Sequence, residues 1–108
     1  LRDVIVEKLK KENYEVIEAI DGEAGWQLTA NHHPDLIVLD IILPVLNGFD
    51  YLARVKKQSD LAKIPVIILS NLGQAEDVEK GMSLGAKDYM IKAHFTPTDL
   101  IEKIKQYV

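Results

Sequence analysis

Cysteine is absent from this sequence of 108 residues, which also has only four prolines and two phenylalanines. The absence of cysteine excludes a disulfide framework and a thiolate metal site, and it fits a reducing compartment. No apolar run approaches the ~18 residues that cross a bilayer, and the first residues do not resemble the apolar core of a signal peptide. We therefore expect a cytoplasmic protein with no membrane partner.

Positive charge is also in short supply, because 13 lysines and arginines stand against 17 acidic residues and give a net charge of -4. Phosphate backbones require clustered lysines and arginines, so direct binding of nucleic acid is not expected. The hydrophobic fraction of 47% and the charged fraction of 28% are typical of a globular domain. The length suits a single core, so we expect one domain over residues 1–108.

Extended apolar runs alternate with helical patterns along the chain. The predicted strands are 14–19, 35–40, 64–70 and 88–92, and the helical patterns cover about 1–12, 22–29, 48–57, 74–84 and 97–108. Strands that alternate with helices pair in parallel through right-handed crossovers. The predicted fold class is therefore α/β, a three-layer α/β/α sandwich with a parallel sheet.

Polar residues stand at the ends of three predicted strands: Asp40, Ser70 and Lys92. In an open α/β sheet the site lies beyond the carboxyl ends of the strands, so the three residues should meet at one edge. One such residue alone is usually a turn former or a solvated charge, but three together suit a phosphoryl group. The carboxylate can be its acceptor, and the hydroxyl and ammonium can bind its oxygens. Phosphoryl transfer usually requires Mg²⁺ as well, and Asp40 and the carbonyl of Ile42 offer two oxygen ligands.

At these residues the sequence resembles a known family. The segment LIVLDIILPVLNG at 36–48 is an apolar strand ending in Asp40, followed by a loop with Pro44 and then Asn-Gly. It resembles the phosphoacceptor segment of the receiver domain of bacterial two-component response regulators. Ser70 is similar to the switch hydroxyl of that family, and Tyr89 and Lys92 are similar to the aromatic residue and lysine of its last strand. The resemblance extends over the whole chain.

The resemblance implies a flavodoxin-like fold with strand order 2-1-3-4-5. It also implies that a sensor histidine kinase or a phosphotransfer protein passes a phosphoryl group to Asp40 with Mg²⁺ bound. Lys92 would then pair with a phosphoryl oxygen, Ser70 would move inward, and the Tyr89 ring would turn into the vacated space. Such a domain is regulatory, and apart from its own phosphorylation and dephosphorylation it is not an enzyme.

An output face is implied as well, made by the fourth helix, the last strand and the last helix. On the last strand this face includes Lys87, Tyr89 and Ile91. In the family, phosphorylation changes how this face contacts a second copy or an effector domain, so a homodimer or an attached effector domain is an expected partner.

Three departures from the family pattern bear on the site. Ala93 follows Lys92 where the family has proline, and Asn71 follows Ser70 where it has a small residue. The family's first strand, and the acidic pair at its end that holds Mg²⁺, have no counterpart in this sequence. We therefore expect an incomplete metal site, a gap between strands 14–19 and 35–40, and roughly ten further residues upstream in the natural protein.

Two other classes of protein are alternatives. Phosphatases of the haloacid dehalogenase kind also use an aspartate after a buried strand, but they need a second aspartate two residues later, where this chain has Ile42. A pseudo-receiver keeps the fold and binds proteins without being phosphorylated. The missing acidic pair leaves this second alternative open.

Overall fold

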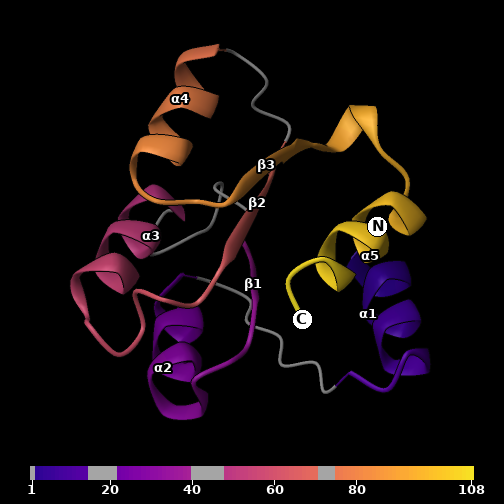
Figure 1. Ribbon diagram of the computed structural model, residues 1–108, viewed down its shortest axis with the longest axis horizontal. Coiled ribbons are helices and arrows are strands. Elements are labelled where there is room, and N and C mark those ends of the chain that lie inside the picture. The colour runs from indigo at the N-terminus through magenta and orange to yellow at the C-terminus, as the bar shows by residue number, and fades with distance from the viewer. Residues whose placement is uncertain (1, 15–21, 40–47, 71–74) are drawn as a thin grey trace.

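The computed structural model describes residues 2–14, 22–39, 48–70 and 75–108 (Figure 1). Its elements are α1 (Arg2–Lys11), α2 (Gly22–His32), β1 (Ile37–Leu39), α3 (Gly48–Lys57), β2 (Val66–Ser70), α4 (Ala75–Ser83), β3 (Asp88–Ile91), the 3-10 turn η1 (Lys92–His94) and α5 (Pro97–Lys105). The alternation of helix and strand follows the predicted order. The strand predicted at 14–19 lies outside the described residues, except for Tyr14.

The sheet is parallel, with the order β1-β2-β3 among the described strands. Ile37 pairs with Val66 and Leu39 pairs with Ile68, while Ser70 at the end of β2 pairs with Ile91. All five residues of β2 are buried, as expected of a central parallel strand that helices cover on both faces. The predicted parallel pairing is confirmed.

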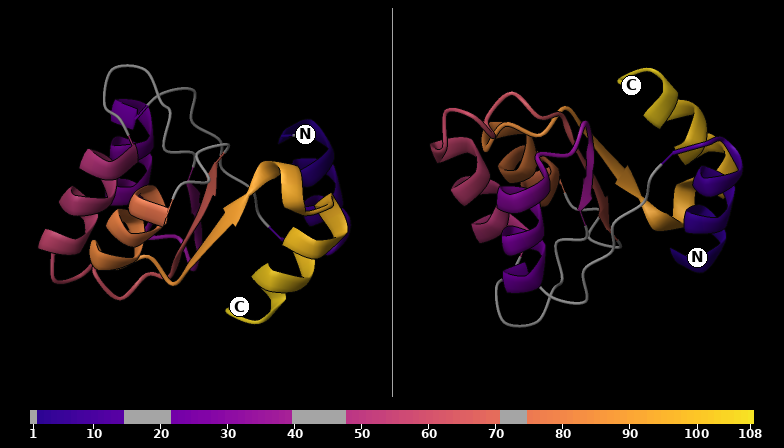
Figure 2. Two further views of the ribbon diagram at one scale, coloured as in Figure 1. Left: turned by 90° about the horizontal axis from the view of Figure 1, so that it is seen from above. Right: turned by 90° about the horizontal axis from the view of Figure 1, so that it is seen from below.

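Helices cover both faces of this sheet. In both views of Figure 2, α2, α3 and α4 lie on one side of the strands, whereas α1 and α5 lie together on the other. The three-layer α/β/α sandwich predicted from the sequence is therefore confirmed. Within the described residues, no helix is both long and apolar enough to span a membrane.

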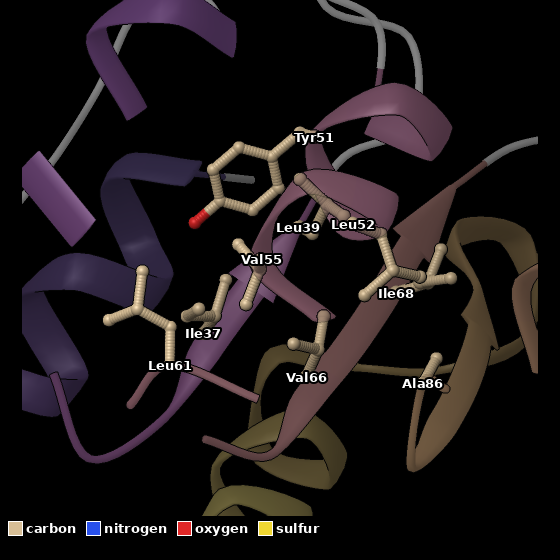
Figure 3. Packing of buried hydrophobic residues seen from close by; sticks show 9 residues of the cluster. All are labelled: Ile37, Leu39, Tyr51, Leu52, Val55, Leu61, Val66, Ile68 and Ala86. Carbon is tan, nitrogen blue, oxygen red and sulfur yellow. The ribbon is translucent and has the colours of Figure 1, made fainter. Parts of the chain in front are cut away.

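The hydrophobic core has one cluster of side chains on each face of the sheet. The cluster under α2, α3 and α4 is shown in Figure 3 and contains Ile37, Leu39, Tyr51, Leu52, Val55, Leu61, Val66, Ile68 and Ala86. The cluster under α1 and α5 contains Ile5, Ile67, Leu69, Leu100, Ile101 and Ile104. Successive residues of a strand point to opposite faces, so Ile67 and Ile68 enter different clusters.

Local signals at the start of α5 form a helix cap. The Thr96 hydroxyl accepts a hydrogen bond from the Asp99 amide at 3.2 Å, and the Asp99 carboxylate accepts one from the Thr96 amide at 2.9 Å. Pro97 occupies the first helical turn, where its missing N–H costs nothing. This reciprocal capping box fixes where the chain enters the helix.

The first and last residues of the strands are less well predicted than the first residues of the helices. β1 and β2 begin two residues later than predicted, at Ile37 and Val66, and the amide of Ile37 donates to the carbonyl of Pro65 at 3.0 Å. The strand prediction at Lys92 is wrong, because Lys92 begins η1. Among the described residues, the last pair between β2 and β3 is Ser70 with Ile91.

A buried polar contact joins α2 to α3. The Thr29 hydroxyl donates to the carbonyl of Gly25 at 2.8 Å and also contacts the Tyr51 hydroxyl. Because the single hydroxyl proton of Thr29 is used on Gly25, Tyr51 must be the donor in the second hydrogen bond. Burial raises the pKa of Tyr51 above its ordinary value. Helix α2 extends three residues beyond its predicted end at Thr29.

The turn after α4 depends on Gly85, which directly follows the helical pattern expected at about 74–84. We expect Gly85→Ala to lower the free energy of unfolding by about 1–3 kcal/mol, because a φ of 107° is one that residues with a side chain rarely adopt. An added Cβ would also lie 3.1 Å from Cε of Lys56, but that flexible stem can move. Urea unfolding measures the loss, which should be similar in a Lys56→Ala background. A loss that disappears in that background would locate the cost in the side-chain contact and contradict the backbone explanation.

Candidate functional site

The register of the sheet places the ends of three strands at one edge. Leu39, Ile68 and Tyr89 form a row across β1, β2 and β3, because Leu39 pairs with Ile68 and Ile68 pairs with Tyr89. Asp40 follows Leu39 directly in the chain. Asp40 and Ile42 lie outside the described residues, so the positions of their atoms stay predictions.

Ser70 is the last residue of β2, the central strand of the described sheet, and its side chain is completely buried. A hydroxyl in the interior normally requires a hydrogen-bond partner, and Ser70 is among the residues that have one. It pairs with Ile91, so it lies one row before the residue at which β3 turns into η1. The predicted switch hydroxyl is thus buried at the carboxyl end of the sheet.

Lys92 follows the last paired residue of β3 and starts η1. Its backbone is described, whereas its side chain lies outside what the structure describes. No peptide bond between described residues is cis, so the bond from Lys92 to Ala93 is trans. The departure from proline at position 93 is therefore accompanied by an ordinary peptide geometry.

Tyr89 lies in the middle of β3 and is half-buried against the core cluster beneath α2, α3 and α4. Its amide donates to Oδ1 of Asp88 at 2.8 Å. An ideal Cβ on Gly81 of α4 would lie 3.1 Å from the Tyr89 ring, so the helix approaches the ring closely. Sequence reasoning missed this contact, for which the only signal was a glycine in the middle of a predicted helix.

Asp88 joins β3 to α5, which the sequence did not predict. Its Oδ2 lies 3.0 Å from Nζ of Lys103, and both side chains are about one-third exposed. The hydrogen bond that Lys103 donates to Asp88, followed by the negative charge of Asp88, raises the pKa of Lys103 above the ordinary lysine value. Since Asp88 and Tyr89 are neighbours on a strand, the ion pair and the ring belong to opposite faces of the sheet.

Three residues were predicted for the output face: Lys87, Tyr89 and Ile91. Tyr89 and Ile91 share one side of the pleat of β3 because they alternate, and Lys87 directly precedes the strand. Lys87 is exposed, whereas Tyr89 and Ile91 are half-buried. All three therefore retain accessible surface. Whether this face carries the output is not tested by the structure and stays a prediction.

A metal site was predicted at the same edge. Among residues 2–14, 22–39, 48–70 and 75–108, no group of three or more acidic, histidine or cysteine side chains is placed to hold a metal ion. Asp40 and Ile42, the two predicted ligands, fall in the segment 40–47. The described residues alone therefore do not make a site that fits Mg²⁺.

Known proteins similar to this chain agree with its fold. Residues 1–105 match the family model of the response regulator receiver domain. A probable transcriptional regulator, ycf27, of Cyanophora paradoxa is 37% identical over 105 residues, which are 97% of this chain and 42% of that protein. The DNA-binding dual master transcriptional regulator RpaA of a Synechocystis strain is 34% identical over 97% of this chain and 43% of its own length. The chain thus spans less than half the length of these relatives.

Solved structures give the same result. The chemotaxis protein CheY4 of Vibrio cholerae superposes with a TM-score of 0.88 at 26% identity, covering 99% of this chain and 88% of that one. The receiver domain of a sensor histidine kinase of Pseudomonas aeruginosa, solved with a magnesium ion in its active site cleft, has a TM-score of 0.86 at 25% identity over 98% and 86% of the two chains. The flavodoxin-like receiver fold predicted from the sequence is confirmed, and the chain belongs to the family of response regulator receiver domains.

Proposed function

We propose that this chain is a phosphorylation-operated signalling switch whose phosphate acceptor is Asp40. The observation that carries the proposal is the parallel register, which ends β1, β2 and β3 at one edge with the hydroxyl of Ser70 buried there. Asp40 follows β1 and Lys92 follows β3 in the chain. A carboxylate, a hydroxyl and an ammonium group at one edge suit a transferred phosphoryl group.

In the proposed reaction, a carboxylate oxygen of Asp40 attacks the phosphorus atom of a phosphohistidine on the partner protein. The P–N bond breaks as the P–O bond forms, and the released imidazole nitrogen keeps its electron pair. Lys92 would neutralise one phosphoryl oxygen, and Ser70 would donate a hydrogen bond to another. A bound Mg²⁺ would neutralise further charge, and Asp40 and the carbonyl of Ile42 would be the ligands that this chain offers.

The switch follows from the added charge. Phosphorylation adds about -1.5 to -2 charges at neutral pH, and these attract the Ser70 hydroxyl toward the site. Tyr89 lies two rows from Ser70 along the sheet and is only half-buried, so its ring has room to change position when Ser70 moves. The face that includes Lys87, Tyr89 and Ile91 would then change its contacts with a partner.

The partners we propose are a sensor histidine kinase or a phosphotransfer protein upstream, and a second copy or an effector domain downstream. Two relatives are named as transcriptional regulators, and this chain matches about two-fifths of each. Residues 1–108 would serve as the receiver domain and would lack the first strand of the family. Its site of action would be the cytoplasm, and nucleic acid would be contacted only through an effector domain.

Intact mass after treatment with acetyl phosphate and Mg²⁺ tests the proposal. Two proteins are compared: this chain, and a version in which a receiver-family first strand ending in two acidic residues is fused before Leu1. We expect a single phosphoryl adduct on at least one of them, removed by hydroxylamine because an acyl phosphate is labile to it. An adduct only on the fused version would assign the missing metal ligands to the added acidic pair.

The alternative of a pseudo-receiver predicts a different outcome. If neither protein acquires an adduct while both unfold cooperatively in urea, the proposed switch is wrong and a protein-binding module is favoured. Circular dichroism of the same samples separates this outcome from a failure to fold.

A further inference from the structure

Helix α4 contacts the sheet through an unusual residue. Among its described residues Ala75–Ser83, the buried one is Gly81, and most of the others are charged or exposed. A helix that packs on a sheet normally uses large apolar side chains for this purpose. Here the buried residue has no side chain, so the position of α4 depends on what lies directly under Gly81.

Two side chains lie under Gly81. An ideal Cβ at this position would be 2.6 Å from Cδ1 of Ile68, and 3.1 and 3.4 Å from Cδ2 and Cε2 of Tyr89. Ile68 is completely buried within the core cluster (Figure 3), so it has little freedom to move away. The half-buried ring of Tyr89 is the neighbour that can change its place.

The same turn of α4 has further attachments. Nζ of Lys80 lies 4.5 Å above the centre of the Phe49 ring in the first turn of α3, which is a cation–π contact. The carbonyl of Gly81 accepts a hydrogen bond from the amide of Ala86 at 3.2 Å. The helix is therefore held beside Gly81 from α3 and from the turn that leads into β3, and in Figure 1 it lies next to β3.

We propose that Gly81 is the positioning residue that couples the ring of Tyr89 to helix α4. Because no side chain separates the helix from the ring, a turn of the ring changes the surface on which α4 rests. The regulatory consequence depends on the proposed function, in which the Tyr89 ring turns after phosphorylation. The coupling itself is a packing property of the unphosphorylated protein, and it goes beyond the residues assigned to the site.

A double-mutant cycle tests the packing. Gly81→Ala adds the Cβ, and Ile68→Val deletes Cδ1, the atom that this Cβ would meet. Alanine favours a helix over glycine, so without the contact Gly81→Ala would raise the urea midpoint. We expect instead that the midpoint falls, and that Ile68→Val recovers part of the fall, with a coupling of at least about fivefold in the unfolding equilibrium constant.

Ile67→Val is the matched control for this cycle. Ile67 is as buried as Ile68 on the same strand, but it belongs to the cluster under α1 and α5, on the other face of the sheet. The loss of stability caused by Ile67→Val should add to the loss caused by Gly81→Ala, without coupling between the two. Should Gly81→Ala not fold at all, recovery of a folded protein by Ile68→Val and not by Ile67→Val supports the contact. A Gly81→Ala protein as stable as the wild type, with no coupling to Ile68, overturns it.

A second measurement follows the ring directly. With 3-fluorotyrosine in place of tyrosine, the ¹⁹F resonance of Tyr89 is assigned by its absence from the Tyr89→Phe variant. We expect Gly81→Ala to shift this resonance and Ile68→Val to return it toward the wild-type position, whereas Glu79→Ala, at an exposed position of α4, should leave it unchanged. A Tyr89 resonance unaffected by Gly81→Ala overturns the coupling. Neither measurement uses a phosphodonor, so a failure to phosphorylate Asp40 would count only against the proposed function.

Discussion

Replacing Asp40 by asparagine is expected to abolish the phosphoryl adduct that acetyl phosphate produces on this protein. The change is made in whichever version accepts the phosphoryl group, the chain itself or the version with the fused first strand. A carboxylate oxygen carries the charge and the electron pair needed to attack phosphorus, whereas a neutral amide forms no stable acyl phosphate. The change keeps the size of the side chain nearly constant, so the fold should be preserved. Intact mass spectrometry measures the result as one adduct or none.

Asp35→Asn is a matched control for this experiment. Asp35 is an exposed aspartate just before β1, so it precedes the same strand that Asp40 follows. Its replacement should leave the adduct in place, since it lies at the amino end of the parallel strands and away from the proposed site. An adduct that survives Asp40→Asn and disappears in Asp35→Asn would reverse this assignment.

Leu52→Ala is expected to have the largest effect on stability, a loss of about 3–4 kcal/mol in the free energy of unfolding. Leu52 is completely buried in α3 and packs within the cluster shown in Figure 3. Alanine would lose the transfer free energy of the removed atoms and leave a cavity that the close-packed neighbours fill only partly. For a domain that is stable by about 5–15 kcal/mol, this is a large fraction of the total.

Fluorescence of Trp26, the single tryptophan of the chain, can follow this unfolding because its ring packs against the same cluster. The same truncation at the half-buried Leu28 of α2 is the comparison, and it should cost less than half as much. Equal losses at the two positions would mean that burial in this cluster does not determine the cost.

The start of α5 at Pro97 was predicted from the sequence, because a helix start depends on neighbouring residues. The capping box at Thr96 and Asp99 needs only a threonine and an acid three positions apart, and the structure contains it. The end of α4 before Gly85 likewise needs only a residue that tolerates a positive φ. The limits of strands were predicted less well, since strand pairing depends on residues that are distant in the sequence, and Lys92, predicted to end the last strand, begins η1.

By itself, the sequence determined the alternation of helices and strands, the parallel pairing, and the chemical types of the candidate site residues Asp40, Ser70 and Lys92. These follow from periodicity and from position along the chain, which local physical chemistry controls. Only the tertiary structure decided which distant residues meet. Two contacts depend on how each helix lies on the sheet: the ion pair of Asp88 with Lys103, and the packing of Gly81 against Ile68 and Tyr89. Distances between side chains on different elements are set by register and packing, which no single segment of the sequence contains.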